Sequence, residues 1–453
     1  MRLNRRHWIA WATVLLMIAA ACGDGDADTT TTAATPGGDV DMTGADIALF
    51  GNPAGAEGES IQGLFDAYNE AMGSSVRYDG SDDFETQLRI RVDGGDPPQV
   101  AIVPQPAQVC EFADAGHLES LEDMGFDIGQ LESDAGKFSM DLGLCDDGMH
   151  YGIPWFAGFK SLIWYHQPTF ADQGYEIPET YDDLVDLSAQ IVADGMTPWC
   201  IGWGSDAATG WPGTDFIEDI VARQHGPDVY AQWMTHEIPS NDPQIVESFN
   251  TFGEILHGEG FVLGGADGVG AITYQEAANP LFNDPPGCLM HKQADFVTGF
   301  FPEGGTDIVT FFPFPSINGN QAALGSGDTI IVFDATPQVV QAVTDWISPE
   351  WSCAGASASG GTASQHGGHG IDGFERLFAN KSVPLDCYET DLKKDLAQRL
   401  QAALDADIYV YDASDVMPTE VGFGTFFPGM VDFSRGSSAE DVTGDMEAAW
   451  PSS

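Results

Sequence analysis

Strand and helix signals alternate near the start of the folded part, and this alternation limits the fold most strongly. Short apolar runs at 46–50, 76–78 and 99–103 have the length and composition of buried strands. Two helical patterns lie between them, and they end at Gly73 and Gly94. A β-α-β-α-β order predicts a parallel sheet covered by helices on both faces, which places the chain in the α/β class.

One edge of this predicted sheet is a candidate binding rim. Ligands of open α/β sheets bind beyond the carboxyl ends of the strands. That edge carries Gly51-Asn52, the segment 80–84 and Pro104-Gln105. Asp83 lies here at the start of a helix, where its carboxylate could either face a ligand or compensate the helix dipole.

The rest of the chain also contains both kinds of element. Thr180 begins a helix with capping-box spacing, and Thr214 is expected to cap another. Strands are expected at 162–165, 295–300, 308–313 and 328–333, and helices at 245–257, 337–346, 392–404 and 439–450. At 453 residues the chain is too long for one hydrophobic core, so two lobes are expected.

The N-terminus has the pattern of an export signal. Residues 1–21 combine arginines with an apolar run that is too short to span a membrane. Small residues precede Cys22, as in the lipobox of bacterial lipoproteins, so lipidation of Cys22 is expected; an ordinary signal peptide is the alternative. Export could use the general or the twin-arginine route. Residues 22–44 are rich in Gly, Asp, Thr and Ala and predict a disordered tether.

The net charge of −54 excludes nucleic acid and anionic membrane surfaces as partners. The acids are spread along the chain, and no calcium-binding loop pattern occurs. A solvated acidic surface is therefore favoured over cation binding, and no metal is expected. His366 and His369 lie in a Gly-rich segment without flanking ligands and are assigned to a solvated loop. The absence of a phosphate-binding loop motif agrees with a protein that needs no cofactor.

Six further cysteines predict disulfides in an exported protein. No C-x-x-C pair occurs, which makes zinc or redox chemistry a poor explanation. Fifteen pairings are possible. The sequential pairing is favoured, namely Cys110–Cys145, Cys200–Cys288 and Cys353–Cys387.

Aromatic and acidic residues alternate between 151 and 219, a mixture that suits the faces and the polar edge of a flat ligand. No Ser, Cys or His has a recognisable catalytic setting there, so the chain is interpreted as a binder and not an enzyme. Candidate binding residues are Trp155 and Trp211 beside prolines, Asp215 at a helix start, Phe300, and Gly327-Asp328 after a Gly-Ser pair. The alternatives are core positions for the rings and a cap role for Asp215.

Several segments together resemble the extracellular solute-binding proteins of carbohydrate ABC transporters, particularly the α-glucoside type of family 1. They include Gly80–Glu85, Tyr151–Trp155, Lys160–Tyr165, Pro178–Asp183, Asp194–Trp199, Trp211–Asp219, Gly325–Asp328, Ser414–Pro418 and Gly424–Met430. Two departures are Gln99, where the family usually has Asp, and Asp82, where Arg is frequent. The second departure lies at the expected rim, so ligand preference could differ.

The resemblance implies a two-lobed periplasmic-binding-protein-like fold (type II), with hinged lobes around a ligand cleft. The first lobe would comprise 45–155 with about 328–385, and the second about 156–327 with 386–453. The implied function is capture of an α-glucoside or other oligosaccharide by a lipid-anchored monomer at the outer face of the cell membrane, and its delivery to an ABC permease. Alternatives are a non-sugar solute bound by the same fold, or an exported glycoside hydrolase with two catalytic carboxylates.

Overall fold

The computed structural model describes residues 40–358, 376–388, 390–406 and 408–451. The expected signal peptide (1–21), Cys22, most of the 22–44 tether, and the histidines at 366 and 369 lie outside these ranges. Met42, at the end of the expected tether, is buried in the core. Among the described helices, none is both long and apolar enough to cross a membrane.

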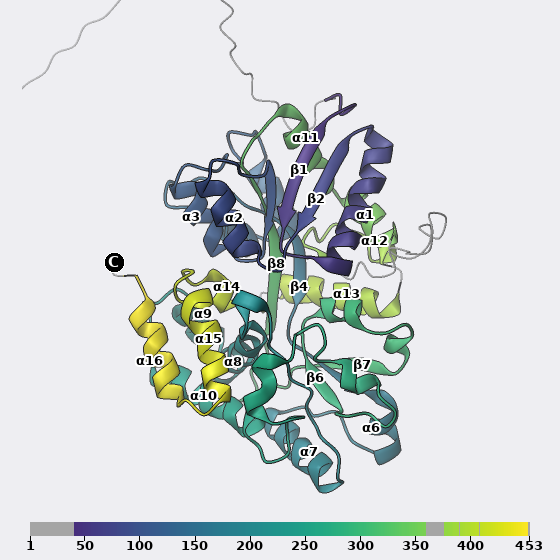
Figure 1. Cartoon of the computed structure of the whole chain (residues 1–453), viewed down its shortest axis with the longest axis vertical. Helices are drawn as coiled ribbons and strands as arrows, with labels where there is room; N and C mark the ends of the chain where they lie inside the picture. Colours follow the sequence, from purple (N-terminus) through teal and green to yellow (C-terminus); the bar gives the residue numbers. More distant parts are fainter. Residues whose placement is uncertain (1–39, 359–375, 389, 407, 452–453) are drawn as a thin grey trace, which may run out of the picture. The chain divides into compact units, whose positions relative to one another are not determined.

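The N-terminal β-α-β-α-β unit forms as predicted. Strands β1 (Asp46–Gly51), β2 (Ser75–Gly80) and β3 (Val100–Val103) pair in parallel, with β1 in the middle. Helix α1 (Gly55–Met72) connects β1 to β2, and α2 (Phe84–Asp93) connects β2 to β3 (Figure 1). The carboxyl ends of these strands therefore meet at one edge, where the sequence predicts the binding rim.

Strand β8 (Ala323–Val332) extends this sheet. It runs antiparallel to both β3 and β4 (Ile153–Phe159) and lies between them. Strands β8 and β4 lie side by side in Figure 1. The sheet order is β2-β1-β3-β8-β4-β9, in which β9 is Leu377–Phe378. The short strand β10 (Tyr409–Tyr411) pairs in parallel with the first half of β8 and completes seven strands. We call the elements around this sheet the first lobe.

A second, three-stranded antiparallel sheet has the order β6-β5-β7. Its strands are β5 (Leu162–His166), β6 (Met290–Lys292) and β7 (Val309–Pro313). Only Lys160 and Ser161 separate β4 from β5, so the chain passes directly from one sheet to the other. We call the elements around this smaller sheet the second lobe.

The other helices pack around these sheets and around each other. They are α3 (Ala107–Asp114), α4 (Ile128–Ala135), α5 (Lys137–Asp141), α6 (Gln167–Gln173), α7 (Tyr181–Ala193), α8 (Trp211–Gln224), α9 (Pro227–Met234), α10 (Pro243–Leu256), α11 (Pro337–Trp346), α12 (Pro349–Ala358), α13 (Asp391–Asp405), α14 (Ala413–Val416), α15 (Phe427–Ser434) and α16 (Ala439–Ala449). Thr180 caps α7 in the predicted capping box with Asp183.

Two local predictions are wrong. The helix expected to begin at Thr214 begins at Trp211, because Gly210 adopts a left-handed φ of 117° and Pro212 suits the first turn. The hydroxyl of Thr214 donates instead to the carbonyl of Trp211. The segment Asp295–Phe300, expected as a strand, is a 3-10 helix, since short apolar runs do not distinguish the two.

Three disulfides join the cysteines in the sequential pairing, which confirms that prediction. Cys110 bonds Cys145, Cys200 bonds Cys288, and Cys353 bonds Cys387. Their Cα–Cα separations are 5.4, 5.5 and 5.1 Å, which suit an unforced bridge. The third bridge connects α12 to the turn before α13.

Candidate ligand-binding cleft

A cavity that is open to solvent lies at the carboxyl edge of the first sheet and is lined by both lobes. The lining residues are Asn52, Glu57, Asp82, Glu85, Pro104, Gln105, Lys160, Ser205, Ala208, Trp211, Tyr274, Phe296, Ser326, Gly327, Asp328, Arg376, Asp415 and Phe427. This lining contains no histidine and no cysteine.

An aromatic wall from the second lobe forms one side of the cavity. The ring centroid of Trp211 lies 5.3 Å from that of Tyr274 and 6.1 Å from that of Phe296. Tyr274 and Phe296 are 6.3 Å apart and nearly perpendicular, at 78°. Trp211 occupies this position because α8 begins with it. Such rings offer apolar faces on which the C–H face of a ligand ring can pack.

Arg376 is the main cation on the side of the first lobe. Its Nε donates to Glu57 at 2.6 Å, and its Nη1 donates to Asp328 at 2.7 Å. Its Cζ also lies 5.3 Å from the ring centroid of Phe296, so the guanidinium contacts both lobes. Burial alone would lower the pKa of Arg376, but Asp328 and Glu57 raise it above its usual range. The guanidinium therefore stays charged.

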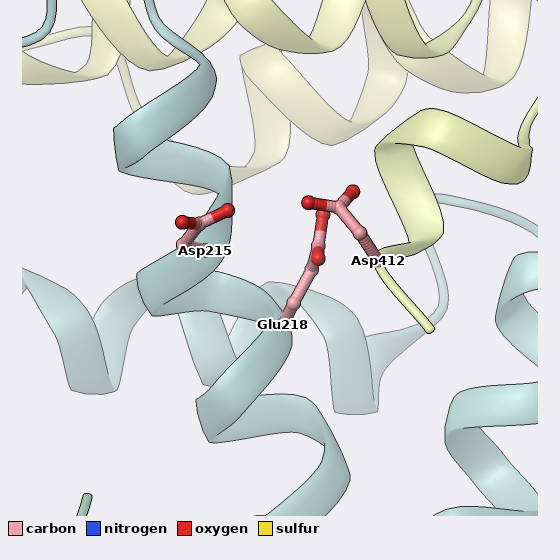
Figure 2. A group of neighbouring side chains, drawn as sticks. All are labelled: Asp215, Glu218 and Asp412. Atoms are coloured by element: carbon pink, nitrogen blue, oxygen red, sulfur yellow. The ribbon is translucent and has the colours of Figure 1, made fainter. Parts of the chain in front are cut away.

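Lys160 provides the second cation from the connection between the two sheets. Its Nζ is 3.0 Å from Oδ1 of Asp215 and also donates to Asp412. The same Nζ is 5.1 Å from the ring centroid of Trp211. The lysine side chain is 6% exposed and lines the cavity from beneath, while Asp215 and Asp412 lie behind it. Figure 2 shows these two carboxylates with Glu218 between them.

Three of the residues predicted to bind ligand line the cavity: Trp211, Gly327 and Asp328. Gly327 lies in β8, where a Cβ would come within 2.4 Å of the carbonyl oxygen of Phe156 in β4. Glycine is therefore needed for strand pairing, and not only for the approach of a ligand. Asp215 does not line the cavity but holds the lysine that does.

The other three predicted residues lie away from the lining. Asp83 precedes α2, and its neighbours Asp82 and Glu85 face the cavity instead. Trp155 is buried, stacks on Phe156 with centroids 4.0 Å apart, and donates from Nε1 to a backbone carbonyl. Phe300 packs behind the aromatic wall, 5.8 Å from Tyr274. These three residues are therefore not part of the proposed site.

Several lining residues were not identified from the sequence. Arg376 follows a low-complexity segment and has no motif around it, so its position depends on long-range contacts alone. Lys160 and Asp415 lie within segments that carry the family resemblance. Lysine and arginine together number only 16 in the chain. A lysine between two apolar segments, such as Lys160, was therefore unusual enough to suggest a functional residue.

Comparisons with known proteins agree with the fold and the cavity. Residues 52–348 match the family described as bacterial extracellular solute-binding proteins. The osmoprotective compounds-binding protein GgtB of Synechocystis is 34% identical over 92% of this chain and 95% of its own length. The α-glucosides-binding periplasmic protein AglE of Rhizobium meliloti is also 34% identical, over 91% of this chain and 88% of its own.

Solved structures show the same two-lobed α/β fold. A chitin oligosaccharide binding protein superposes with a TM-score of 0.72 at 18% identity, covering 89% of this chain and 98% of the other. The maltose-bound MalE3 of T. maritima gives 0.67 at 16% identity, with the same two coverages. The fold, the family match over most of the chain and two full-length relatives lead to one assignment. This chain belongs to the bacterial extracellular solute-binding protein family.

Proposed function

We propose that this protein captures a small carbohydrate, with an α-glucoside as the first candidate, and delivers it to an ABC transporter permease. The observation that carries the proposal is the cavity itself. An aromatic wall faces charged and amide groups across an open space. Sugar rings need both an apolar surface and polar groups, because they present C–H faces and hydroxyl edges. The relative named for α-glucosides supports this ligand class.

Binding would work by closing the two lobes around the ligand. Glu57, Glu85 and Asp328 approach from the first lobe, and Trp211 and Tyr274 from the second. A ligand that contacts both sides stabilises the closed arrangement over an open one, and the permease would recognise the closed form. Charge-assisted hydrogen bonds contribute about 1.5–3 kcal/mol each, so a few of them with one stacked ring give micromolar affinity.

The remaining parts of the proposal come from the sequence. The signal at 1–21 and Cys22 support an exported protein that is lipid-anchored at the outer face of the membrane. The family consists of binding proteins, so we infer no catalysis. Nitrophenyl glycosides test this inference, since measurable turnover would favour the hydrolase alternative.

Calorimetric titration of residues 40–453 against maltose, trehalose, sucrose and longer α-glucans tests the proposal. We expect micromolar binding to at least one of them. The variant Trp211→Ala should bind at least tenfold more weakly, because it loses the stacking surface. Trp450→Ala, which removes an indole packed on His236 outside the cavity, is the matched control and should bind as wild type does.

Two results would contradict the proposal. If the folded protein binds none of these sugars, the proposed ligand changes from a sugar to a non-sugar solute. A folded Trp211→Ala variant with unchanged affinity would remove the aromatic wall from the binding site.

A further inference from the structure

Four carboxyl groups lie together beneath the cavity. Asp215 and Glu218 belong to α8, Asp412 follows β10, and Asp415 belongs to α14. One oxygen each from Asp215, Glu218 and Asp412 lies within 4.8 Å of the other two. Figure 2 shows Asp215 and Glu218 on one helix and Asp412 facing them. Asp415 is 8% exposed and the other three at most 1%, so water screens their charges little.

The hydrogen bonds within this carboxyl cluster are unevenly distributed. Oδ1 of Asp412 accepts from the hydroxyl of Ser414 and from the backbone N–H of Asp415. Oε1 of Glu218 accepts from the backbone N–H of Ser414 at 3.1 Å. Oε2 of Glu218 is buried and has no hydrogen-bond partner among the residues that the structure describes. A buried ionised oxygen in that position would be costly, whereas a protonated carboxyl can donate toward its neighbours.

Only Lys160 forms an ion pair with the cluster in the described part of the chain, with Asp215 and Asp412. Other ionisable groups that interact with it are Lys292 on β6, Glu85 on α2 and Tyr230 on α9. Lys292 also pairs with Asp219 on α8, whose second partner is Arg223. Tyr409 and Tyr411 of β10 complete the surroundings. Four ionised carboxylates cannot be balanced by one ammonium group. The ammonium also lies between Asp215 and Asp412, where it would repel a metal ion.

The directions of the pKa shifts agree with this excess of carboxyl groups over ammonium groups. Burial raises the pKa of Asp215 to about 7, and burial together with the charge of Asp412 raises the pKa values of Glu218 and Asp415 well above their usual range. Burial would also raise the pKa of Asp412, but Lys160 lowers it below the ordinary value. Asp412 is therefore the ionised partner of the lysine, and the other carboxyls compete for protons.

The cluster connects to the ligand through two of its members, because Lys160 and Asp415 both line the cavity. An uncharged ligand that fills the cavity displaces water from Asp415 and brings no charge to replace it. The neutral form of the carboxyl is then favoured further. Lys160 has a third N–H beyond those directed at Asp215 and Asp412, and this N–H can donate to a ligand oxygen.

We propose that the carboxyl cluster beneath the cavity shares protons at neutral pH and takes up more when an uncharged ligand binds, so that capture is coupled to pH. Asp215, Glu218 and Asp412 act as positioning residues through Lys160, and Asp415 adjoins the ligand. The inference rests on the proposed function, because it requires a ligand in this cavity. Affinity should be highest in mildly acidic solution.

Titration calorimetry of residues 40–453 with the sugar that binds, at pH 7 in phosphate and in Tris, counts the protons exchanged with the buffer. We expect net uptake in wild type and a Kd that rises between pH 6 and pH 8, by up to about tenfold per pH unit for one whole proton. Glu218→Gln keeps the shape of the side chain and should reduce both effects. Asp415→Asn is the second variant and should do the same if Glu218→Gln does not fold. The matched control is Glu247→Gln, whose carboxylate is 62% exposed on α10, and it should retain both effects.

The outcomes separate this inference from the proposed function. A sugar that binds with equal enthalpy in both buffers and a constant Kd from pH 6 to pH 8 overturns proton coupling and leaves sugar binding intact. Proton coupling is also overturned if calcium raises the melting temperature of wild type but not of Glu218→Gln, since a metal would then fill the cluster. No sugar binding at any pH overturns both proposals.

Discussion

Arg376 illustrates how much of the cavity depends on single side chains. One guanidinium satisfies Glu57 on α1 and Asp328 on β8, and it packs on an aromatic ring of the opposite lobe. The side chain of Asp328 is 3% exposed beside Arg376, so its carboxylate depends on the guanidinium for charge compensation. Breaking such a pair usually costs more than the pair contributes, because a buried charge is left uncompensated.

The variant Arg376→Met should therefore lower the free energy of unfolding by about 3 kcal/mol. Urea denaturation measures this change. The double variant Arg376→Met, Asp328→Asn removes the orphaned charge as well and should recover at least half of the loss. A single variant as stable as wild type would show that water replaces the guanidinium without cost.

Asp215 gives stability a pH dependence of known sign. Its pKa is about 7 in the folded protein, above the usual value of 3.8, so the folded state holds a proton that the unfolded state has lost. Stability from this group is complete below pH 4 and declines as the pH rises through 7. Denaturation by urea at pH 5, 6 and 7.5 should show this decline. Asp215→Asn should flatten the curve, and an equally steep curve in that variant would assign the dependence to other groups.

At the scale of elements, the start of α8 decides where the aromatic wall lies. Gly210 precedes the helix with a φ of 117°, and a Cβ on it would come within 1.9 Å of the carbonyl oxygen of Phe427. The glycine thus serves both the backbone conformation and the close contact between α8 and α15. Because Trp211 is the next residue, this contact sets the position of the indole in the cavity.

Gly210→Ala should destabilise the protein by at least about 3 kcal/mol, because the steric clash adds to the left-handed backbone penalty of about 1–2 kcal/mol. Gly226→Ala is the matched control. Gly226 also precedes a helix, with a φ of 90°, but a Cβ there meets nothing within 4 Å. It should lose only the backbone term. Thermal and urea unfolding compare the two, and equal losses would exclude the contact with Phe427 as the cause.

Local patterns were sufficient for elements whose signals are local. The alternation of β1, α1, β2, α2 and β3, the capping box of α7, and helix α11 follow from periodicity and turn residues. Strand β4 and the first half of β8 were missed, since they are defined by pairing with each other across more than 150 residues. Arg376 was missed for the same reason, whereas Trp211 and Asp328 lie in short motifs that the sequence makes visible.

At the scale of the whole molecule, the acidic composition should make stability depend on salt. The chain has a net charge of −54 and a calculated isoelectric point near 4.1. Repulsion among so many like charges disfavours the compact state, and dissolved ions screen it. The cavity lining is acidic as well, because it contains five carboxyl groups beside the two cations Arg376 and Lys160.

The melting temperature at pH 7.5 should therefore rise between about 0.05 and 1 M sodium chloride, where the Debye length falls from more than 10 Å to about 3 Å. At pH 4.1 the net charge is close to zero, so the same salt series should change the melting temperature much less. Calorimetry at both pH values makes the comparison. An equal rise at both would indicate general salting-out and not screening of charge.

The disulfide between Cys353 and Cys387 determines what proteolytic cleavage of the chain produces. It closes a covalent ring that includes Arg376, the residue that holds Glu57 and Asp328 at the cavity. A protease that nicks the ring between residues 353 and 387 produces two polypeptides that remain one molecule until a reducing agent separates them. Such nicked protein would migrate as intact on a non-reducing gel, and the part of the ring bearing Arg376 would still be tied to the body of the protein by sulfur.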